Sequence, residues 1–350
     1  MKKFPKIPQT AMKKLCLIAV VALLFGACSP KAGTTPEKKG SSGKTLEVLV
    51  VADRNVYCGA TKALVDSIFT CPQVGLPQPE SRFDIVNIPM SSYENSEMFR
   101  NHRNILLMDV KPGNPDKVFL HVDEYAAPQV VVDFAARSNE SLNDLLRHYE
   151  PQVLEQIYGA EHRRVIKAFA GMPNFQVNDA IRQQFGFDLM FSKEFSMAKQ
   201  EDGFAWVRKE AKDFGIGVLV DMFAYRDTSI FQETQLLDRL DTVMARHVPS
   251  SAPGSYMGLE RRRDNDGNYL APIVSKRVPF EGSDYCVETR GCWRSFGDWM
   301  GGPFVSYALL SPDKKNVIIL TGYVYCPRNK PWTKRDLLMQ VEGICHSLKF

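Results

Sequence analysis

The residues that could do chemistry together gather in one stretch, from Asp284 to Cys326. They combine a carboxylate, a guanidinium, two indoles and a glycine pair: Glu288, Arg290, Trp293, Trp299, Gly301 and Gly302. On a strand, Glu288 and Arg290 point to the same face, so they can form an ion pair. An arginine held in this way beside aromatic rings could recognise an anionic or sugar ligand, or the strand of a partner protein. The same group could instead be a buried ion pair and a Trp core at the corner of a sheet, and the sequence favours this structural role.

A second set of candidates is acidic. Asp53, Asp109 and Asp133 each lie at or near the end of an apolar run that predicts a strand. Ligands bind at the carboxyl ends of the strands in an α/β sheet, so these carboxylates could hold Mg²⁺ or act in acid–base chemistry. Asp is also common in turns and helix caps. No Gly-rich phosphate loop follows the first strand, and we therefore interpret all three as turn and cap residues. A hydrolase that uses them remains the alternative function.

Neither the histidines nor any short motif indicates a metal or catalytic site. The six histidines stand at positions 102, 121, 148, 162, 247 and 346, without metal-ligand spacing. We expect His148 and His162, in a long helical region, to face solvent. The sequence has neither C-x-x-C nor G-x-S-x-G. The run Arg261–Arg263 beside Asp264 and Asp266 is interpreted as a solvated loop, with a site for an anionic ligand or a lipid headgroup as the alternative. We predict no catalytic residue, no metal and no cofactor.

Cys16 and Cys28 are assigned to an N-terminal targeting segment. The six cysteines that remain stand at positions 58, 71, 286, 292, 326 and 345. An even number in an exported chain is compatible with disulfides. Their spacing along the expected helix and strands does not bring obvious pairs together. We therefore expect buried free thiols, with a bridge from Cys286 or Cys292 to Cys326 as the alternative.

Three strands and a closing helix should position the first candidate group. The strands are expected at Tyr285–Trp293, Phe304–Leu310 and Val317–Tyr325, with a hairpin turn at Ser311–Asn316. Between the first two strands, Gly297–Pro303 predicts an ordered connection, in which the glycine pair permits positive φ values. The helix is expected at Lys334–Leu348, with one apolar stripe.

The first half of the chain predicts an α/β domain over residues 46–172. Its strands are expected at Leu46–Ala52, Phe83–Ile88, Asn104–Val110, Val118–Val122 and Gln129–Phe134. Their continuous apolar runs indicate strands that are buried on both faces. A helix is expected at Ala60–Phe69. Ser138 should cap a long helical region that reaches Ala170, with Pro151 starting its second segment.

Residues 173–350 predict an α+β domain, with a mainly antiparallel sheet and two helices that cover one side of it. Further strands are expected at Asp188–Phe191, Phe204–Arg208, Ile216–Tyr225 and Ile273–Val278. Helices are expected at Val177–Phe185 and Phe231–Arg246. The order of elements is similar to the PsbP/Mog1-like sandwich, and this similarity would imply a binding scaffold.

The N-terminus has the pattern of a bacterial lipoprotein signal. Residues 1–27 combine a basic start, the apolar run Leu15–Phe25 and small residues before Cys28. Eleven apolar residues are too few to span a bilayer, which needs about 20. We expect Cys28 to carry the lipid, including palmitate, and residues 28–45 to form a flexible tether. An ordinary secretory signal cut near Ala27 is the alternative.

Charge argues against nucleic acid as a partner. The whole chain has a net charge of +4, but residues 1–27 contain five lysines and no acidic residue. Without them, 39 basic residues stand against 40 acidic ones, so no basic surface is indicated. The residues after Cys28 lack an acidic run, and this favours an anchor that faces the periplasm.

Three motifs carry a resemblance to a known family. They are E-x-R-G-x-W from Glu288, W-M-G-G-P-F-V-S from Trp299 and G-Y-V-Y-x-P from Gly322. With N-I-L-L-M-D-V at Asn104–Val110, this pattern resembles a family of Bacteroidetes lipoproteins known only as a domain of unknown function. The resemblance implies no activity, cofactor or catalytic residue.

Together these patterns predict a lipid-anchored protein of the outer membrane that faces the periplasm. We expect a non-enzymatic binding or envelope-assembly module. The expected partners are the membrane, through the N-terminal lipid, and an envelope protein or a glycan, but no nucleic acid.

Overall fold

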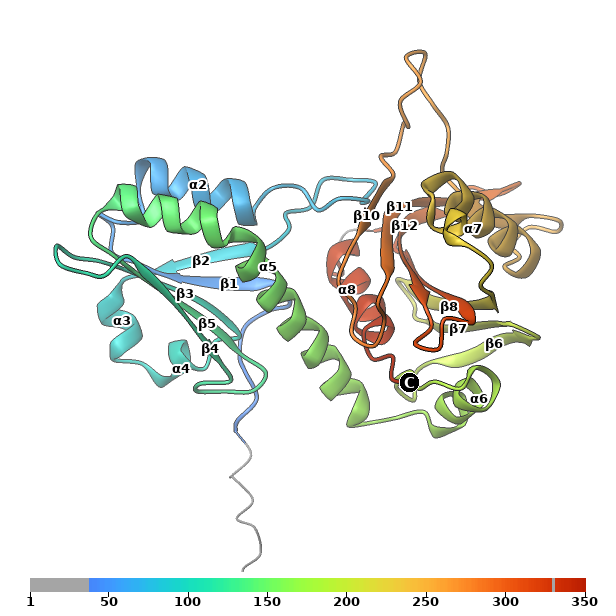
Figure 1. The fold of residues 1–350 in the computed structure, drawn as a ribbon, viewed down its shortest axis with the longest axis horizontal. Coiled ribbons are helices and arrows are strands. Elements are labelled where there is room, and N and C mark those ends of the chain that lie inside the picture. Colours follow the sequence, from blue (N-terminus) through green and yellow to red (C-terminus); the bar gives the residue numbers. More distant parts are fainter. Residues whose placement is uncertain (1–37, 329–330) are drawn as a thin grey trace, which may run out of the picture. The chain divides into compact units, whose positions relative to one another are not determined.

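A computed structural model describes residues 38–328 and 331–350. The predicted signal segment, Cys28 and the tether up to residue 37 lie outside the described residues. The rest of the chain builds two β-sheets and their helices (Figure 1).

The first sheet has five strands in the order β2-β1-β3-β5-β4. Their bounds are β1 Glu47–Val51, β2 Asp84–Ile88, β3 Asn104–Val110, β4 Lys117–Val122 and β5 Val130–Ala136. All neighbours are parallel except β4, which pairs antiparallel with β5 at one edge. The predicted α/β sheet is therefore confirmed.

Helices cover both faces of this sheet, and this explains its continuous apolar strands. In β1, Val48 and Val50 point into one core, and Leu49 and Val51 point into the other. The helices α2 (Gly59–Phe69) and α5 (Asn139–Ala170) cover the first face, whereas α3 (Met90–Glu94) and α4 (Glu97–Arg100) contribute to the second core. The sequence did not predict α3 and α4, because each is too short to show a helical period.

Helix α5 runs without interruption from Asn139 to Ala170. Its N-terminus is capped as predicted, because the Ser138 side chain accepts a hydrogen bond from Ser141 N. The predicted second segment starting at Pro151 is wrong, since this proline lies inside the helix. A proline removes one backbone hydrogen bond, and buried side chains on either side of it, such as Leu146 and Ile157, hold the helix together.

The second sheet has eight antiparallel strands. Seven follow the order β10-β11-β12-β13-β8-β7-β6, and β9 pairs with β11. Their bounds are β6 Ser196–Glu201, β7 Phe204–Glu210, β8 Gly215–Ala224, β9 Tyr256–Leu259, β10 Val274–Arg277, β11 Cys286–Phe296, β12 Gly301–Leu310 and β13 Asn316–Tyr325. This is the predicted antiparallel α+β arrangement. The predicted strand Asp188–Phe191 is wrong: Asp188 forms only an isolated bridge with Lys349, and the segment is an apolar loop.

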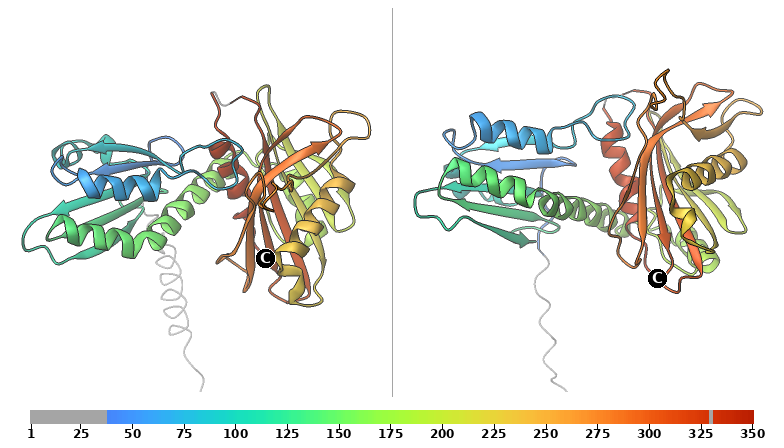
Figure 2. Two further views of the ribbon diagram at one scale, coloured as in Figure 1. Left: turned by 90° about the horizontal axis from the view of Figure 1, so that it is seen from above. Right: turned by 45° about the horizontal axis from the view of Figure 1, so that its top comes forward.

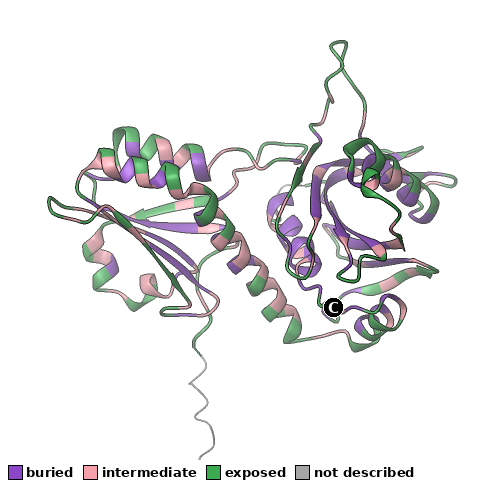
Figure 3. Ribbon diagram, in the orientation of Figure 1, coloured by how far each residue is buried: buried purple, intermediate pink, exposed green. Residues whose placement is uncertain are grey.

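The helices of this sheet lie on two faces, not on one as expected. The helices α6 (Phe175–Phe185) and α8 (Lys334–Cys345) pack into one core with the sheet. The helix α7 (Glu233–His247) packs into the opposite core, preceded by the 3-10 turn Thr228–Phe231. The central strands β12 and β13 are buried along almost their whole length, so both of their faces need a cover (Figure 3). Two further views of the fold show α7 and α8 on opposite sides of this sheet (Figure 2).

Candidate functional site

The structure divides the predicted candidate group between two hollows. Glu288 and Arg290 line a cavity of about 860 Å³, which we call the ionic cavity. Trp293, Trp299, Gly301 and Gly302 line a second hollow of about 540 Å³, which we call the Trp299 groove.

The segment between α2 and β2 contributes to both hollows. Gln73 and Val74 line the ionic cavity, and Pro77 and Gln78 line the Trp299 groove. Between these pairs, Gly75 accepts a hydrogen bond from Cys292 Sγ at 3.5 Å. A residue 217 positions earlier in the chain thus lies directly against β11.

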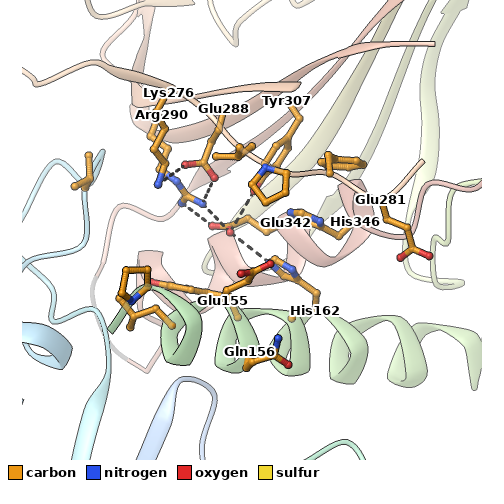
Figure 4. Close-up of a pocket in the computed structure, with 18 of the residues that line it drawn as sticks. Glu155, Gln156, His162, Lys276, Glu281, Glu288, Arg290, Tyr307, Glu342 and His346 are labelled. Atoms are coloured by element: carbon orange, nitrogen blue, oxygen red, sulfur yellow. Dashed lines mark hydrogen bonds and ion pairs between the residues drawn. The ribbon is translucent and has the colours of Figure 1, made fainter. Parts of the chain in front are cut away.

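The floor of the ionic cavity is a closed group of buried charges (Figure 4). Arg290 donates from Nη1 and Nη2 to the two carboxylate oxygens of Glu342, at 2.8 and 2.9 Å. It also donates from Nη2 to Glu288 at 2.9 Å, so the predicted ion pair exists. Burial alone would raise the pKa of Glu342, but the Arg290 guanidinium outweighs it and holds this pKa well below its usual range. The same guanidinium also lowers the pKa of Glu288, so both carboxylates are ionised and paired at neutral pH.

Two histidines form a wall of the same cavity, which the sequence did not predict. His162 Nε2 lies 3.6 Å from Glu342, and the His162 ring stacks on that of His346 with centroids 4.0 Å apart. The expectation that His162 faces solvent is wrong, because only 12% of its side chain is exposed. The cause is the packing of α5 against α8, a contact that helical periodicity alone does not reveal. Burial also lowers the pKa of His346 well below its usual value, so this ring stays neutral.

The groups around this floor are poorly suited to nucleophilic chemistry at neutral pH. Burial raises the pKa of Tyr307 well above its usual value, and it does the same for the thiols of Cys286 and Cys345. In residues 38–328 and 331–350, no group of three or more His, Cys, Asp or Glu side chains could hold a metal ion.

The Trp299 groove presents an aromatic ring to solvent. Trp299 is 80% exposed, whereas Trp293 is buried and donates a hydrogen bond from Nε1 to Val324 O at 3.0 Å. The loop that carries Trp299 is fixed by Asp298, which accepts hydrogen bonds from Trp299 N at 2.7 Å and from Ser250 Oγ at 3.1 Å. Trp299 is therefore held on an ordered loop.

Paired charges form another wall of the groove. Glu260 is buried and accepts hydrogen bonds from Arg262 Nε and Nη2, the latter at 2.6 Å, and Arg294 lies 3.7 Å away. The run Arg261–Arg263 lies in a loop with Arg262 and Arg263 exposed, as predicted. Arg261 bonds Asp238 and Asp241, and the guanidinium of Arg263 lies over the ring of Tyr269.

Positions 301 and 302 require glycine for a reason other than the positive φ values that the sequence suggested. Gly301 and Gly302 lie within β12, and neither has a positive φ value; in this connection only Gly297 does, at +84°. A Cβ atom at Gly302 would lie 2.0 Å from Val324 O. The pair is therefore needed because the backbone of β12 passes close to neighbouring atoms.

Two of the three predicted carboxylates, Asp53 and Asp109, have local structural partners. Asp53 accepts a hydrogen bond from Met90 N at the start of α3, and Asp109 pairs with Lys111 at 2.9 Å. Asp133 lies in the middle of β5, opposite Leu107, and not at a strand end. Burial raises its pKa.

The six cysteines at positions 58, 71, 286, 292, 326 and 345 are free thiols, so the alternative bridge to Cys326 is not formed. Four of them are buried as expected, but Cys58 is exposed and Cys71 is half-buried.

The chain matches two protein families without a known activity. Residues 174–347 match the model of a domain of unknown function, DUF4837, and residues 41–170 match that of another, DUF8532. The first match covers α6 to α8 with the antiparallel sheet, and the second covers the mixed sheet with α5. No curated protein matches the chain. Of the helices in the described part of the chain, none is long and apolar enough to cross a membrane.

Proposed function

We propose that this protein is a lipid-anchored binding module that faces the periplasm and holds a glycan of the cell envelope in the Trp299 groove. The anchor is Cys28, from the lipoprotein-like pattern of residues 1–27. In the periplasm, the abundant glycan is peptidoglycan.

The exposed ring of Trp299 carries this proposal. Burying an indole normally stabilises a fold, so an ordered loop that keeps 80% of a Trp exposed points to a ligand. The C–H face of a sugar ring is apolar and can stack on the indole. The hydroxyl groups of the sugar can bond to charged side chains such as Arg262 and Arg294, which lie in the same groove.

The electrostatics of the groove favour binding over cleavage. Glycoside hydrolysis generally needs one carboxylic acid with a raised pKa as the proton donor. The groove holds two carboxylates, Glu260 and Asp298. Hydrogen bonds, chiefly from Arg262 to Glu260 and from Ser251 to Asp298, lower the pKa of both groups. Both are therefore ionised at neutral pH, and neither suits the role of acid.

Co-sedimentation with purified peptidoglycan sacculi tests the glycan. The mature protein, extracted from membranes in detergent, should sediment with the sacculi. Trp299→Ala should lower its affinity about thirtyfold or more, because aromatic anchors of this kind typically contribute about 2 kcal/mol or more. Phe175→Ala is the matched control, since Phe175 is 71% exposed on α6 and does not line the groove. Equal binding by Trp299→Ala and the unchanged protein would refute this site.

Metabolic labelling with palmitate tests the anchor separately. The unchanged protein should incorporate the label, and Cys28→Ser should not. Cys58→Ser is the control, because Cys58 is an exposed thiol of the folded part and should leave the labelling intact. Label that persists in Cys28→Ser would contradict the anchor, whatever the outcome with sacculi.

A further inference from the structure

The edge strand β4 exposes more apolar side chains than the edge strands β2, β6 and β10. In the described part of the chain β4 pairs only with β5, and its middle is apolar: Phe119 is 44% exposed, and Leu120 and Val122 are each 47% exposed. Proteins usually protect such edges with charged side chains, because an open apolar edge pairs with other strands.

The other edges have this protection. Strand β6 carries Lys199 and Glu201, and β10 carries Lys276 and Arg277. At the opposite edge of the five-stranded sheet, Asp84 of β2 forms an ion pair with Arg335 at 2.9 Å. Strand β4 has Lys117 and His121 of its own, but it exposes three large apolar side chains, whereas β2 and β10 expose one each, Val86 and Val274.

The backbone of β4 fixes which residues can pair outward. Asp123 N donates to Gln129 O, and Val130 N donates to Arg103 O on the β3 side. Hydrogen-bonding direction alternates along an antiparallel strand, so the odd-numbered residues of β4 face β5. The backbone groups of Val118, Leu120 and Val122 therefore point away from the sheet.

These three residues are self-complementary. We propose that β4 pairs antiparallel with β4 of a second copy of this chain, around a two-fold axis at Leu120. In this register Leu120 lies opposite Leu120 of the second copy, and Val118 lies opposite Val122 of the second copy. The outward N–H and C=O groups of these three residues then bond to the C=O and N–H groups of the same residues in the second copy. The two five-stranded sheets thereby join into one.

Charge at the strand ends favours the same register. Lys117 stands at one end of β4, and Asp123 and Glu124 follow the other end. The two-fold axis at Leu120 brings Lys117 of each copy toward the acidic end of the other, where Asp123 follows the strand and accepts a hydrogen bond from Gln129 N at 2.6 Å. A parallel arrangement in the same register would instead place like charges side by side, at a cost.

The area of contact indicates a reversible dimer. A six-residue strand pair buries less than the roughly 800 Å² per partner of a standard stable interface. Pairing should therefore depend on protein concentration, and tethering to a membrane would favour it by raising the effective concentration. The pairing itself requires neither the anchor nor the glycan.

Cysteine crosslinking in cells that express the full chain tests the register. In Leu120→Cys, the two introduced residues form a directly opposed pair with Cα atoms about 5.5 Å apart, within the range for a disulfide. In Val122→Cys, the two introduced residues lie about 14 Å apart along the strands. Mild oxidation should give about ten times more dimer from Leu120→Cys than from Val122→Cys. When Val118→Cys and Val122→Cys are expressed together, they should form a mixed dimer, because these two positions lie opposite each other in the proposed register.

A second variant separates pairing from folding. Added to the Val118→Cys and Val122→Cys chains, Leu120→Lys at an exposed position should abolish their mixed dimer. Val86→Lys on the β2 edge, added to the same two chains, should leave the mixed dimer unchanged. Equal dimer from Leu120→Cys and Val122→Cys, or none from Leu120→Cys, would overturn the proposal. A crosslink from Leu120→Cys to a different protein would also overturn it, and would assign this edge to a partner strand. None of these outcomes depends on palmitate labelling or on sacculi.

Discussion

At Arg290 one guanidinium pairs with two carboxylates that come from different elements, Glu288 on β11 and Glu342 on α8, and Lys276 brings a second positive charge within 3.4 Å of Glu288. A buried ion pair adds little stability compared with an apolar replacement, but the loss of one partner leaves a buried charge unpaired. Arg290→Ala should therefore lower the free energy of unfolding by about 3–5 kcal/mol, measured by urea denaturation.

The control for this variant is Arg226→Ala, which removes an exposed arginine and should change stability by less than about 0.5 kcal/mol. If Arg290→Ala were as stable as the control, the ionic group would not support the fold, and a binding role for the ionic cavity would become the better interpretation.

The neutral state of His346 predicts a pH dependence of stability. Its ring faces His162, Glu342, Arg290 and Tyr307, and burial lowers its pKa well below the ordinary value of 6.5. Below about pH 6.5 the unfolded chain binds a proton at this residue and the folded chain does not, so stability falls as the pH falls. The slope for one proton is at most about 1.4 kcal/mol per pH unit.

Replacing His346 should remove this part of the slope. His346→Phe keeps a flat ring against Phe280 and should flatten the decline in unfolding free energy between pH 7 and 5. His148→Phe, at an exposed position of α5, should retain it. An unchanged slope in His346→Phe would show that other groups, such as His247 with its lowered pKa, cause the decline.

Two glycines in helices test packing at the scale of elements. Gly159 lies in α5, where an added Cβ would meet only Arg163 Nη1, at 3.8 Å. Gly343 lies in α8, where an added Cβ would meet Val165 Cβ of α5 at 2.5 Å. Ala favours a helix over Gly by about 0.5–1 kcal/mol. Gly159→Ala should therefore stabilise the protein by this amount, and Gly343→Ala should destabilise it.

Thermal unfolding of the two glycine variants under one set of conditions measures this difference. The substitution is chemically the same in both, so opposite changes in melting temperature would assign the effect to the α5–α8 contact. Stabilisation by Gly343→Ala would contradict a close contact at this point.

The sequence predicted best the elements that are specified by residues close together in the chain, through a regular alternation of apolar residues or through turn residues. Strands β11, β12 and β13 show it: alternation and turn residues located them, and the same-face position of Glu288 and Arg290 correctly placed an ion pair. The partners of that pair could not be found this way, because Glu342 lies more than fifty residues further on and His162 comes from α5. The glycine pair was recognised as special, but its reason is the carbonyl of Val324 on a neighbouring strand, a contact that appears only when the sheet forms.

At the scale of the whole molecule, the segments that match different families are joined by specific bonds. The carboxylate of Glu80 accepts hydrogen bonds from Lys334 N at 3.2 Å and Arg335 N at 2.9 Å, so it caps the start of α8. The side chain of Arg335, which is itself buried, bonds Ser81 O at 2.8 Å and Asp84 at 2.9 Å. Residues 40–350 form one compact unit, as these bonds would require.

This connection predicts a single cooperative unfolding transition for the folded part of the chain. In differential scanning calorimetry, the calorimetric and van't Hoff enthalpies should agree, because neither sheet can lose its structure without exposing the buried Arg335 and the uncapped end of α8. The double variant Glu80→Ala, Arg335→Ala should split the transition into two. Asp116→Ala, Arg137→Ala removes an ion pair within the first sheet region and should lower the melting temperature without splitting the peak. Two transitions in the unchanged protein would mean that the two sheets unfold independently, and that the bonds from Glu80 and Arg335 hold them together without coupling their stabilities.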